Sequence, residues 1–266
     1  MGVNVVVCLK QVVDPELPAQ EFAVDPHSRR QVRTGKALVI STYDENALEV
    51  ALQLKDKGAA SGVTVLTVAP AAEAKDAVRL ALAMGADRAV VVDDPRAPAL
   101  LGVEKAALLG AALRRMGGAD LVLTGCESAD WVERVVAPLL AEAIRASCVT
   151  FVSRVEAGGG FVTVKRLADD GVHTVEARLP AVISITSDES NRPRLPKIRD
   201  IMQAGKKPVE TVPAPALGDV PGAMADGVEV REVAIPARTT TCEVLEGEPA
   251  EQADALIQRL RALKVV

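Results

Sequence analysis

Aromatic side chains are scarce in this chain of 266 residues, where they make up only 2% of the sequence. So few rings argue against a surface that stacks nucleic-acid bases. Charge of one sign is lacking too, since 31 basic and 36 acidic side chains leave a net charge of −5, which argues against a strongly basic nucleic-acid binder. Apolar side chains are abundant, at 49%. This composition favours a chain that folds around a large core over a disordered one.

Cysteine and long apolar runs are scarce as well. The four cysteines, Cys8, Cys126, Cys148 and Cys242, have no CxxC spacing and form no zinc-ligand pattern with histidine. We interpret them as buried free thiols and expect no metal site. No window approaches about 18 uninterrupted apolar residues, so no membrane insertion is expected. The N-terminus lacks the pattern of a signal peptide, and the expected location is the cytoplasm, a reducing compartment.

The signatures of common catalytic sites are missing too. The chain contains no GxSxG, HExxH, GxxxxGK(S/T) or GxGxxG motif. Of its two histidines, His27 lies in a polar loop and His173 in a predicted strand, and a structural position is favoured for both. Without a nucleophile–base pair or paired carboxylates, the sequence favours a protein that is not an enzyme.

Up to about residue 150, short β-branched runs alternate with longer Ala- and Leu-rich helical patterns. Strands are predicted over residues 3–9, 63–68, 88–92 and 121–124. Helices are predicted over residues 44–57, 71–84, 102–116 and 130–144, with Asp44 as the N-cap of the first. This order predicts an α/β fold with a parallel, doubly wound sheet covered by helices on both faces. Ligands of such sheets bind beyond the carboxyl ends of the strands.

The pattern changes in the last part of the chain. Small β additions are expected over residues 151–156, 161–167, 172–179 and 181–186. From Pro208 to about Gly227, proline and glycine are dense enough to indicate an extended linker. Beyond it, a strand is predicted over 228–234 and a helix over 249–263. The two expected domains are an α/β core, residues 1–207, and a C-terminal linker and partner-wrapping arm, residues 208–266.

Three loops carry the candidate ligand groups. Lys10 follows the first strand, where its amine can meet a phosphate or a carboxylate, or else is solvated. Ser41 and Tyr43 lead into the first helix, whose N-terminal amides attract anions. The loop 124–130 lies where a doubly wound sheet would bind a mononucleotide. The candidate cofactor-binding residues are Cys8, Lys10, Ser41, Tyr43, Asp44, Val68, Gly125, Glu127, Ser128, Asp130 and Arg134.

Several segments together resemble the β-subunit of electron-transfer flavoproteins. They are VVVCLKQVVD, YDENALEVALQLKDKG, ALAMGADRAVVVDDP, DLVLTGCESAD and the long run from KRLADDG to KKPVE. The turn RLADDG over residues 166–171, followed by LPAVISI, is similar to the family's signature, in which an acidic-Gly turn, a strand and a proline occur in order. The resemblance covers nearly the whole chain.

The resemblance implies an electron carrier that works with a larger α-subunit. In the family, the α-subunit holds most of an FAD, and the β-subunit is a domain related to adenine-nucleotide-binding folds whose C-terminal arm wraps onto the partner. The complex carries electrons from flavin dehydrogenases to an acceptor such as a membrane quinone oxidoreductase. Tyr43 and the loop after Asp14 would face the flavin ring system and influence its potential. The family's β-subunit also binds AMP, or a second FAD in electron-bifurcating members.

The resemblance also implies that residues 191–202 form a loop that docks a hydrophobic side chain into dehydrogenase partners. By position, Leu195 or Ile198 would be the anchor of a small, transient interface. Six basic side chains between residues 192 and 207 would surround the anchor with positive charge, or are merely solvated. The candidate partner-docking residues are Asn191, Pro193, Arg194, Leu195, Ile198, Ile201 and Met202.

One loop departs from the family's pattern. After TGCESAD the family has a glycine-rich run whose backbone amides hold phosphate, whereas this chain has WVERVVA over residues 131–137. Side chains with a Cβ block the close approach that glycine allows. Glu133 adds repulsion, although Arg134 can supply a charged fork. AMP binding is therefore doubtful: either AMP occupies the pocket, or Trp131 fills the adenylate space. Binding of a second FAD is expected even less than binding of AMP.

Two further interpretations stay open. The chain could be a stand-alone sensor of adenine nucleotides, although the glycine-poor loop and the long arm argue against this. It could also be a structural subunit that has lost its nucleotide. The preferred interpretation is a β-subunit that supports an FAD held mainly by an α-subunit and shuttles electrons.

Overall fold

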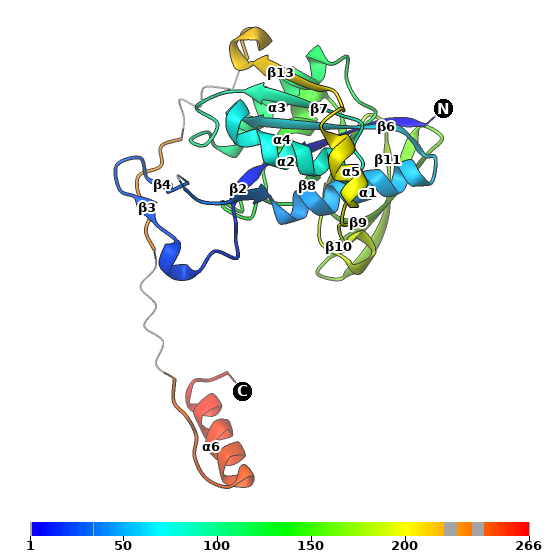
Figure 1. The fold of residues 1–266 in the computed structure, drawn as a ribbon. Coiled ribbons are helices and arrows are strands. Elements are labelled where there is room, and N and C mark those ends of the chain that lie inside the picture. The colour runs from blue at the N-terminus through cyan, green and yellow to red at the C-terminus, as the bar shows by residue number, and fades with distance from the viewer. Residues whose placement is uncertain (1, 34, 221–227, 236–241, 266) are drawn as a thin grey trace. The chain divides into compact units, whose positions relative to one another are not determined.

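The computed structural model describes residues 2–33, 35–220, 228–235 and 242–265. The chain divides into two compact units, Met1–Glu232 and Val233–Val266, which are described separately. In Figure 1 the first unit is a twisted sheet between helices, and the second is helix α6 (Pro249–Ala262) with the segment before it.

The first unit is built on one large sheet with β1 (Val3–Leu9) in its interior. Nine strands of the described residues pair in the order β11-β10-β9-β12-β8-β1-β6-β7-β13. Neighbours from β9 to β13 are parallel, and β10 is antiparallel to both β9 and β11. The other strands are β6 (Ala60–Ala69), β7 (Arg88–Asp93), β8 (Leu121–Gly125), β9 (Ser147–Gly158), β10 (Phe161–Ala168), β11 (Gly171–Arg178), β12 (Ala181–Ile185) and β13 (Val209–Pro213).

Alternate side chains of β1 enter two different cores, because a strand points successive side chains to opposite faces. Val5 and Val7 pack with apolar residues of α1 and α2, whereas Val6 and Cys8 pack with those of α3 and α4. The helices of this unit are α1 (Thr42–Asp56), α2 (Ala71–Met84), α3 (Gly102–Arg115), α4 (Val136–Ile144) and α5 (Ile198–Ala204). The predicted α/β fold with a doubly wound, mostly parallel sheet is confirmed.

The strand order reverses beside β1. The chain adds β6 and then β7 on one side of β1, and α3 then returns it to β8 on the other side. The connections that leave β1 and β8 therefore diverge, which opens a crevice at the carboxyl ends of these two strands.

The sheet contains one strand that the sequence does not predict. β13 pairs in parallel with β7, and both Val212 and Ala214 are buried. The segment from Pro208 was expected to be linker, so this expectation is wrong as far as the 3-10 helix Ala214–Leu217. A proline-containing segment can join a sheet at its edge, where only one side of its backbone pairs. Of the remaining expected linker, residues 221–227 lie outside the described residues.

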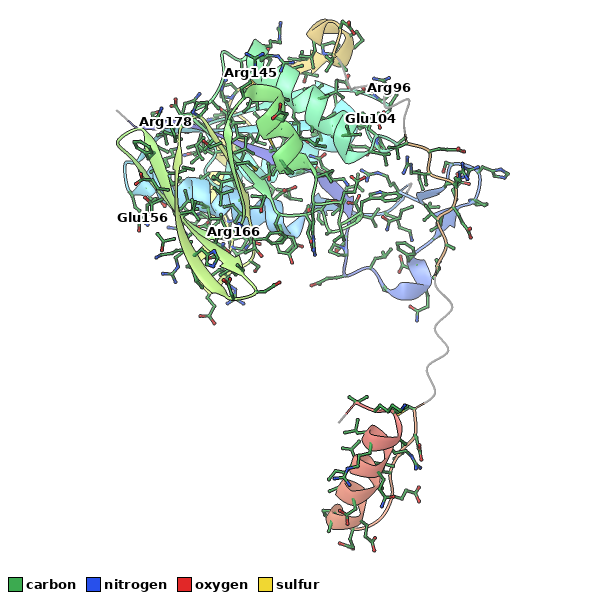
Figure 2. All side chains as sticks on the ribbon, turned by 180° about the vertical axis from the view of Figure 1, so that it is seen from behind. Arg96, Glu104, Arg145, Glu156, Arg166 and Arg178 are labelled. Carbon is green, nitrogen blue, oxygen red and sulfur yellow. The ribbon has the colours of Figure 1, made fainter. Side chains whose placement is uncertain are left out.

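Residues 228–234 were predicted as a strand, and this is wrong: those residues are irregular. The predicted hairpin is confirmed as β9 and β10, and β11 forms the outer edge. In Figure 2 the charged side chains of Glu156, Arg166 and Arg178 lie on these strands. Two short ribbons between β1 and α1 were not predicted: β2 (Gln11–Val13) with β5 (Leu38–Ile40), and β3 (Val24–Asp25) with β4 (Arg30–Gln31).

Two of the four cysteines are buried and two are exposed. Cys8 and Cys126 are buried free thiols as predicted, whereas Cys148 and Cys242 are exposed, so the prediction is wrong for these two. No helix in the described part of the chain combines the length and apolar character needed to cross a bilayer. Among the same residues, no three His, Cys, Asp or Glu side chains gather into a group able to hold a metal ion.

Candidate functional site

A pocket lies in the crevice at the carboxyl ends of β1, β6 and β8, beside the first turns of α3 and α4. About 680 Å³ within it is free of protein atoms, a volume that includes the part that opens to solvent. Its lining includes these predicted cofactor-binding residues: Cys8, Lys10, Asp44, Val68, Gly125, Glu127, Ser128 and Arg134. The fold thus brings together residues more than a hundred positions apart, and their role in binding stays a prediction.

Asp44 joins the ends of the two strands beside the pocket. Its carboxylate accepts backbone hydrogen bonds from Lys10 N and Gly125 N, both at 2.8 Å. The predicted N-cap role is therefore wrong, because Ser41 holds the N-cap position of α1 and Asp44 lies in the first turn. Burial raises the pKa of Asp44 to about 7, against the lowering effect of the two amides and of Lys10.

Gly125 is needed where β8 meets α1. A Cβ at this position would lie 2.7 Å from Asp44 Oδ1 and 2.8 Å from Tyr43 Cβ. The absence of a side chain lets the end of β8 approach the first turn of α1 closely enough for the Asp44 hydrogen bond. Tyr43 lies beside this contact, partly exposed and not in the pocket lining, and burial raises the pKa of its hydroxyl.

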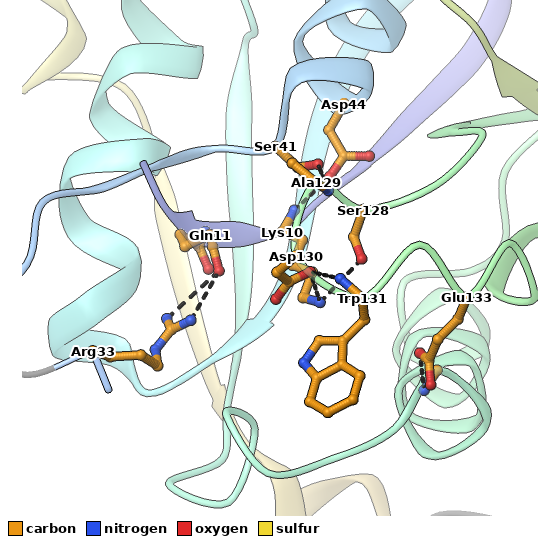
Figure 3. A network of polar contacts seen from close by, with 11 residues as sticks. Lys10, Gln11, Arg33, Ser41, Asp44, Ser128, Ala129, Asp130, Trp131 and Glu133 are labelled. Carbon is orange, nitrogen blue, oxygen red and sulfur yellow. Dashed lines mark hydrogen bonds and ion pairs between the residues drawn. The ribbon is translucent and has the colours of Figure 1, made fainter. Parts of the chain in front are cut away.

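The remaining polar candidates form a network between β1 and the loop after β8 (Figure 3). Lys10 Nζ donates to Asp130 Oδ1 at 2.6 Å and to Ser128 Oγ at 3.2 Å. Ser41 is fully buried and its Oγ accepts a hydrogen bond from Ala129 N at 3.1 Å. Ser41 and Asp130 therefore fix the loop rather than line the pocket.

Lys105 of α3 is a pocket residue that the sequence analysis missed. It lies one helical turn after the start of α3, inside a pattern that reads only as an amphipathic helix, so no local signal marks it. Desolvation by burial, followed by repulsion from Lys10, lowers the pKa of its amine to about 7. The described residues give this amine no hydrogen bond or ion pair.

The loop before α4 carries two charged side chains that reach in different directions. Glu133 Oε2 accepts a hydrogen bond from Gly102 N, at the start of α3, at 2.8 Å. Arg134 forms a short ion pair with Glu127 and lies 5.5 Å from the centroid of the Phe151 ring. The loop is irregular up to Val135, so the helix predicted from residue 130 begins only at Val136.

Trp131 does not fill the pocket. It is absent from the pocket lining, and the Arg30 guanidinium lies 5.1 Å from the centroid of its ring, which is typical of a cation–π contact. The small ribbon β3–β4 supplies the ring with a partner outside this pocket lining, and the plugging of an adenylate space by Trp131 stays a prediction.

The second predicted site is the docking segment, defined as residues 191–202. Its apolar side chains are unusually exposed: Leu195 is 92% exposed, Ile198 80%, Met202 73% and Ile201 40%. Pro193, in the same segment, is half-buried. Large apolar side chains clustered on a surface mark a contact site more often than chance exposure does.

The base of the docking segment is tied to the core. Asn191 is buried, and its amide donates to the carbonyls of Ser153 at 3.1 Å and Thr186 at 2.8 Å. Arg194 forms ion pairs with Glu49 and Asp56 of α1, both at 2.8 Å. Asn191 cannot present its side chain to a partner in this conformation, so its role is to fix the segment, and Arg194 is largely engaged in the same task.

Not all of the basic side chains near the docking segment are solvated. Lys207 Nζ donates to the carbonyls of Leu82 at 2.8 Å and Ala86 at 2.6 Å, at the end of α2. Cations are favourable at the C-terminus of a helix. Arg192, Lys197 and Arg199 are exposed beside Leu195, so they supply the positive charge of this surface.

Comparison with known proteins identifies the chain's relatives. The sequence matches the electron transfer flavoprotein domain over residues 31–217, which is most of the chain. The chain belongs to this family.

Relatives in the family cover almost the full length. The chain is 36% identical to electron transfer flavoprotein subunit beta of Mycobacterium tuberculosis (strain ATCC 25618 / H37Rv) over 276 positions, with 99% of both chains covered. It is 34% identical to the same subunit of Syntrophomonas wolfei, with 98% and 97% covered. It is 31% identical to the caffeyl-CoA reductase-Etf complex subunit CarD of Acetobacterium woodii, over 77% of this chain and 76% of that protein.

These names fix the general role of the chain. A β-subunit of an electron transfer flavoprotein is an electron-transfer subunit and not an enzyme. The family implies a flavin, and the designation β implies an α-subunit as partner.

Proposed function

We propose that this β-subunit binds an α-subunit that holds most of an FAD, and that the pair works in the cytoplasm. The complex takes electrons from flavin dehydrogenases and passes them to an acceptor such as a membrane quinone oxidoreductase. The observation that carries the proposal is the docking segment, which presents exposed apolar side chains on a fixed base.

The docking segment suits a transient redox contact. Leu195 and Ile198 project from a segment whose base is held by Asn191 and Arg194, so little order has to be gained when a partner binds. One or two apolar anchors with a charged rim give specific but short-lived contacts. The exposed cations beside Leu195 favour a dehydrogenase with an acidic docking surface.

The second unit supports an arm that wraps onto the α-subunit. Helix α6 buries none of its side chains, and Leu256 and Ile257 are 49% and 43% exposed. An amphipathic helix gains most of its stability from packing its apolar face. A partner surface would supply that packing.

The first turn of α1 supports a contact with the flavin. Tyr43 is the only tyrosine of the chain, it is partly exposed, and Gly125 and Asp44 fix its backbone. A ring held in this way by a rigid element would contact the isoalloxazine of a partner's FAD and influence the polarity of the flavin's surroundings.

Co-production with an α-subunit tests the proposal. The purified complex should contain both chains in equal amounts and show the visible absorption of oxidised flavin, which a reduced flavin dehydrogenase should bleach. A β-chain that stays alone and colourless contradicts the proposal. A sensor of adenine nucleotides would instead bind them without any partner.

A further inference from the structure

We propose that the pocket of this β-subunit does not accept a nucleoside monophosphate such as AMP, because Glu133 occupies the helix amide that an anion would use and every cation of the pocket lining but Lys105 is already paired. AMP is what the family resemblance leads one to expect in this subunit. The residues present do not fit it, and this holds whichever subunit carries the flavin.

Glu133 binds a backbone amide that would otherwise attract an anionic ligand. Backbone amides at the start of a helix bind anions, because they have no partner within the helix. Here the amide of Gly102, at the start of α3, donates to Glu133 Oε2 at 2.8 Å, as Figure 3 shows. A Cβ on Gly102 would lie only 2.7 Å from the same oxygen, so the carboxylate is packed directly against the backbone.

Most of the other charged side chains of the pocket already have partners before any ligand enters. Its lining contains the cations Lys10, Lys105 and Arg134 and the carboxylates Asp44, Glu127 and Glu133. Lys10 is bound to Asp130 at 2.6 Å, and Arg134 is bound to Glu127. A phosphate dianion would have to break these pairs and would still face Glu133, a cost that one cation does not offset.

Lys105 is the one cation of the lining without a partner among the described residues. Burial and repulsion from Lys10 lower the pKa of Lys105 to about 7, so keeping this amine charged in the pocket costs free energy that a bound anion would have to offset. Lys105 is also a single cation, whereas a phosphate dianion carries two charges and would still face Glu133. Asp130 and Glu133 already compete for it electrostatically.

The backbone of the loop before α4 has a conformation that glycine prefers, but the residues at these positions carry side chains. Val132 has φ 54° and Arg134 has φ 58°, in the left-handed region that residues other than glycine rarely adopt. Loops that cradle phosphate use such backbone turns with bare glycines, so that amides reach the oxygens. At Arg134 a Cβ and a long side chain stand there instead, and the guanidinium turns to Glu127.

The test uses the full chain, or its complex with the α-subunit. Protein as purified is denatured, and released adenylates are measured by chromatography. Equilibrium dialysis with labelled AMP at about 1 mM follows, a concentration that saturates any site of micromolar affinity. Trp131, the only tryptophan, gives an independent fluorescence signal beside the pocket. We expect no adenylate on the purified protein and no saturable AMP binding.

A double variant, Val132→Gly with Glu133→Ser, reverses the two features and keeps the Arg134–Glu127 pair. It removes the Glu133 carboxylate and gives a glycine where the backbone has a positive φ, so it should gain saturable AMP binding, at least about tenfold tighter than the parent chain. Glu133→Gln removes the charge alone and should gain less. Glu142→Gln, on the exposed side of α4, is the matched control and should gain nothing.

Three results would overturn the proposal. They are about one adenylate per purified parent chain, micromolar AMP binding by the parent chain, and a double variant that melts like the parent but gains no AMP binding. If the double variant fails to fold, the parent chain and Glu133→Gln decide. The flavin spectrum of the complex should be unchanged in every variant, so failure here is distinct from failure of the proposed function.

Discussion

At the scale of single residues, close contacts at the carboxyl end of β8 are needed to build the pocket. Gly125 permits the contact between β8 and α1, and Asp44 uses that contact to accept amides from both β1 and β8. The Asp44 carboxyl group thus links the carboxyl ends of β1 and β8, the two strands from which the chain leaves in different directions.

Gly125→Ala should lower the free energy of unfolding by about 1–3 kcal/mol, because the added Cβ would overlap with Asp44 and Tyr43. Urea unfolding measures the change. Gly158→Ala is the control, since nothing lies within 4 Å of a Cβ there. Equal losses in the two variants would contradict the role given to Gly125.

Lys105 makes stability depend on pH. Its pKa is about 7 in the folded chain and 10.5 in the ordinary amine, so between these values the unfolded chain binds more protons. Stability from this residue should therefore rise with pH from about 7 to about 10.5. The parent chain should gain, over this range, roughly 4 to 5 kcal/mol relative to Lys105→Met, because each unit of a pKa shift corresponds to about 1.4 kcal/mol.

Chemical unfolding at pH 7, 8.5 and 10 measures this difference at several points along the titration. Lys57→Met, at the exposed end of α1, is the matched control and should track the parent chain. If the free energy of unfolding changes with pH in the same way in the parent chain and in Lys105→Met, the lowered pKa of the buried amine is contradicted.

At the scale of elements, the docking segment combines a fixed base with an exposed tip. Buried carboxylates and amides hold the base, and Glu49 on α1 is only 5% exposed. Stability and partner binding should therefore be separable by mutation within a dozen residues.

Arg194→Met should loosen the base. It leaves the buried Glu49 carboxylate without its partner, which costs about 1–3 kcal/mol after allowance for the part of Arg194 that faces solvent. Hydrogen exchange should speed up in residues 191–204 and stay unchanged in β1. Arg192→Met, an exposed neighbour, is the control, and equal exchange in both variants would count against the anchor.

Leu195→Ala should affect only the tip. Because the side chain is 92% exposed, the melting temperature should stay within error of the parent chain. If Leu195 is the anchor, its truncation should lower kcat/KM for electron transfer from a flavin dehydrogenase by about tenfold or more. Lys197→Ala should have a smaller effect that fades at high salt. An unchanged kcat/KM in Leu195→Ala would move the anchor to Ile198 or Met202.

At the scale of the whole molecule, the two units differ in how much they bury. The first unit has cores on both faces of its sheet, whereas α6 in the second unit buries no side chain. Under the proposed function, the α-subunit would cover the apolar side chains of this helix.

Replacing Leu256 and Ile257 of α6 by Asp should weaken binding of the α-subunit by about a hundredfold or more, because both apolar side chains are removed from the contact. Analytical ultracentrifugation with the α-subunit measures the binding. The first unit should melt unchanged. Gln258→Asp is the control for added charge, and tight binding by the Leu256→Asp, Ile257→Asp variant would show that the arm does not make the contact.

The sequence by itself determined the class of fold and the family. Periodicity of apolar residues gave the main strands and helices of the first unit, because both patterns are local. It also placed most of the pocket residues in loops at the carboxyl ends of strands, since topology fixes where those ends meet. The apolar residues of the docking segment were found by resemblance.

Only the tertiary structure decided the contacts between distant segments. β13 pairs with the edge that β7 leaves free. Trp131 packs against Arg30, which belongs to a ribbon that was not predicted. Glu133, in the loop before α4, accepts a hydrogen bond from the amide of Gly102 at the start of α3. Lys105 was missed for the same reason: its pattern is helical, and its pocket is made by other segments. Long-range pairing depends on which surfaces the folded chain brings together, and no local spacing records that.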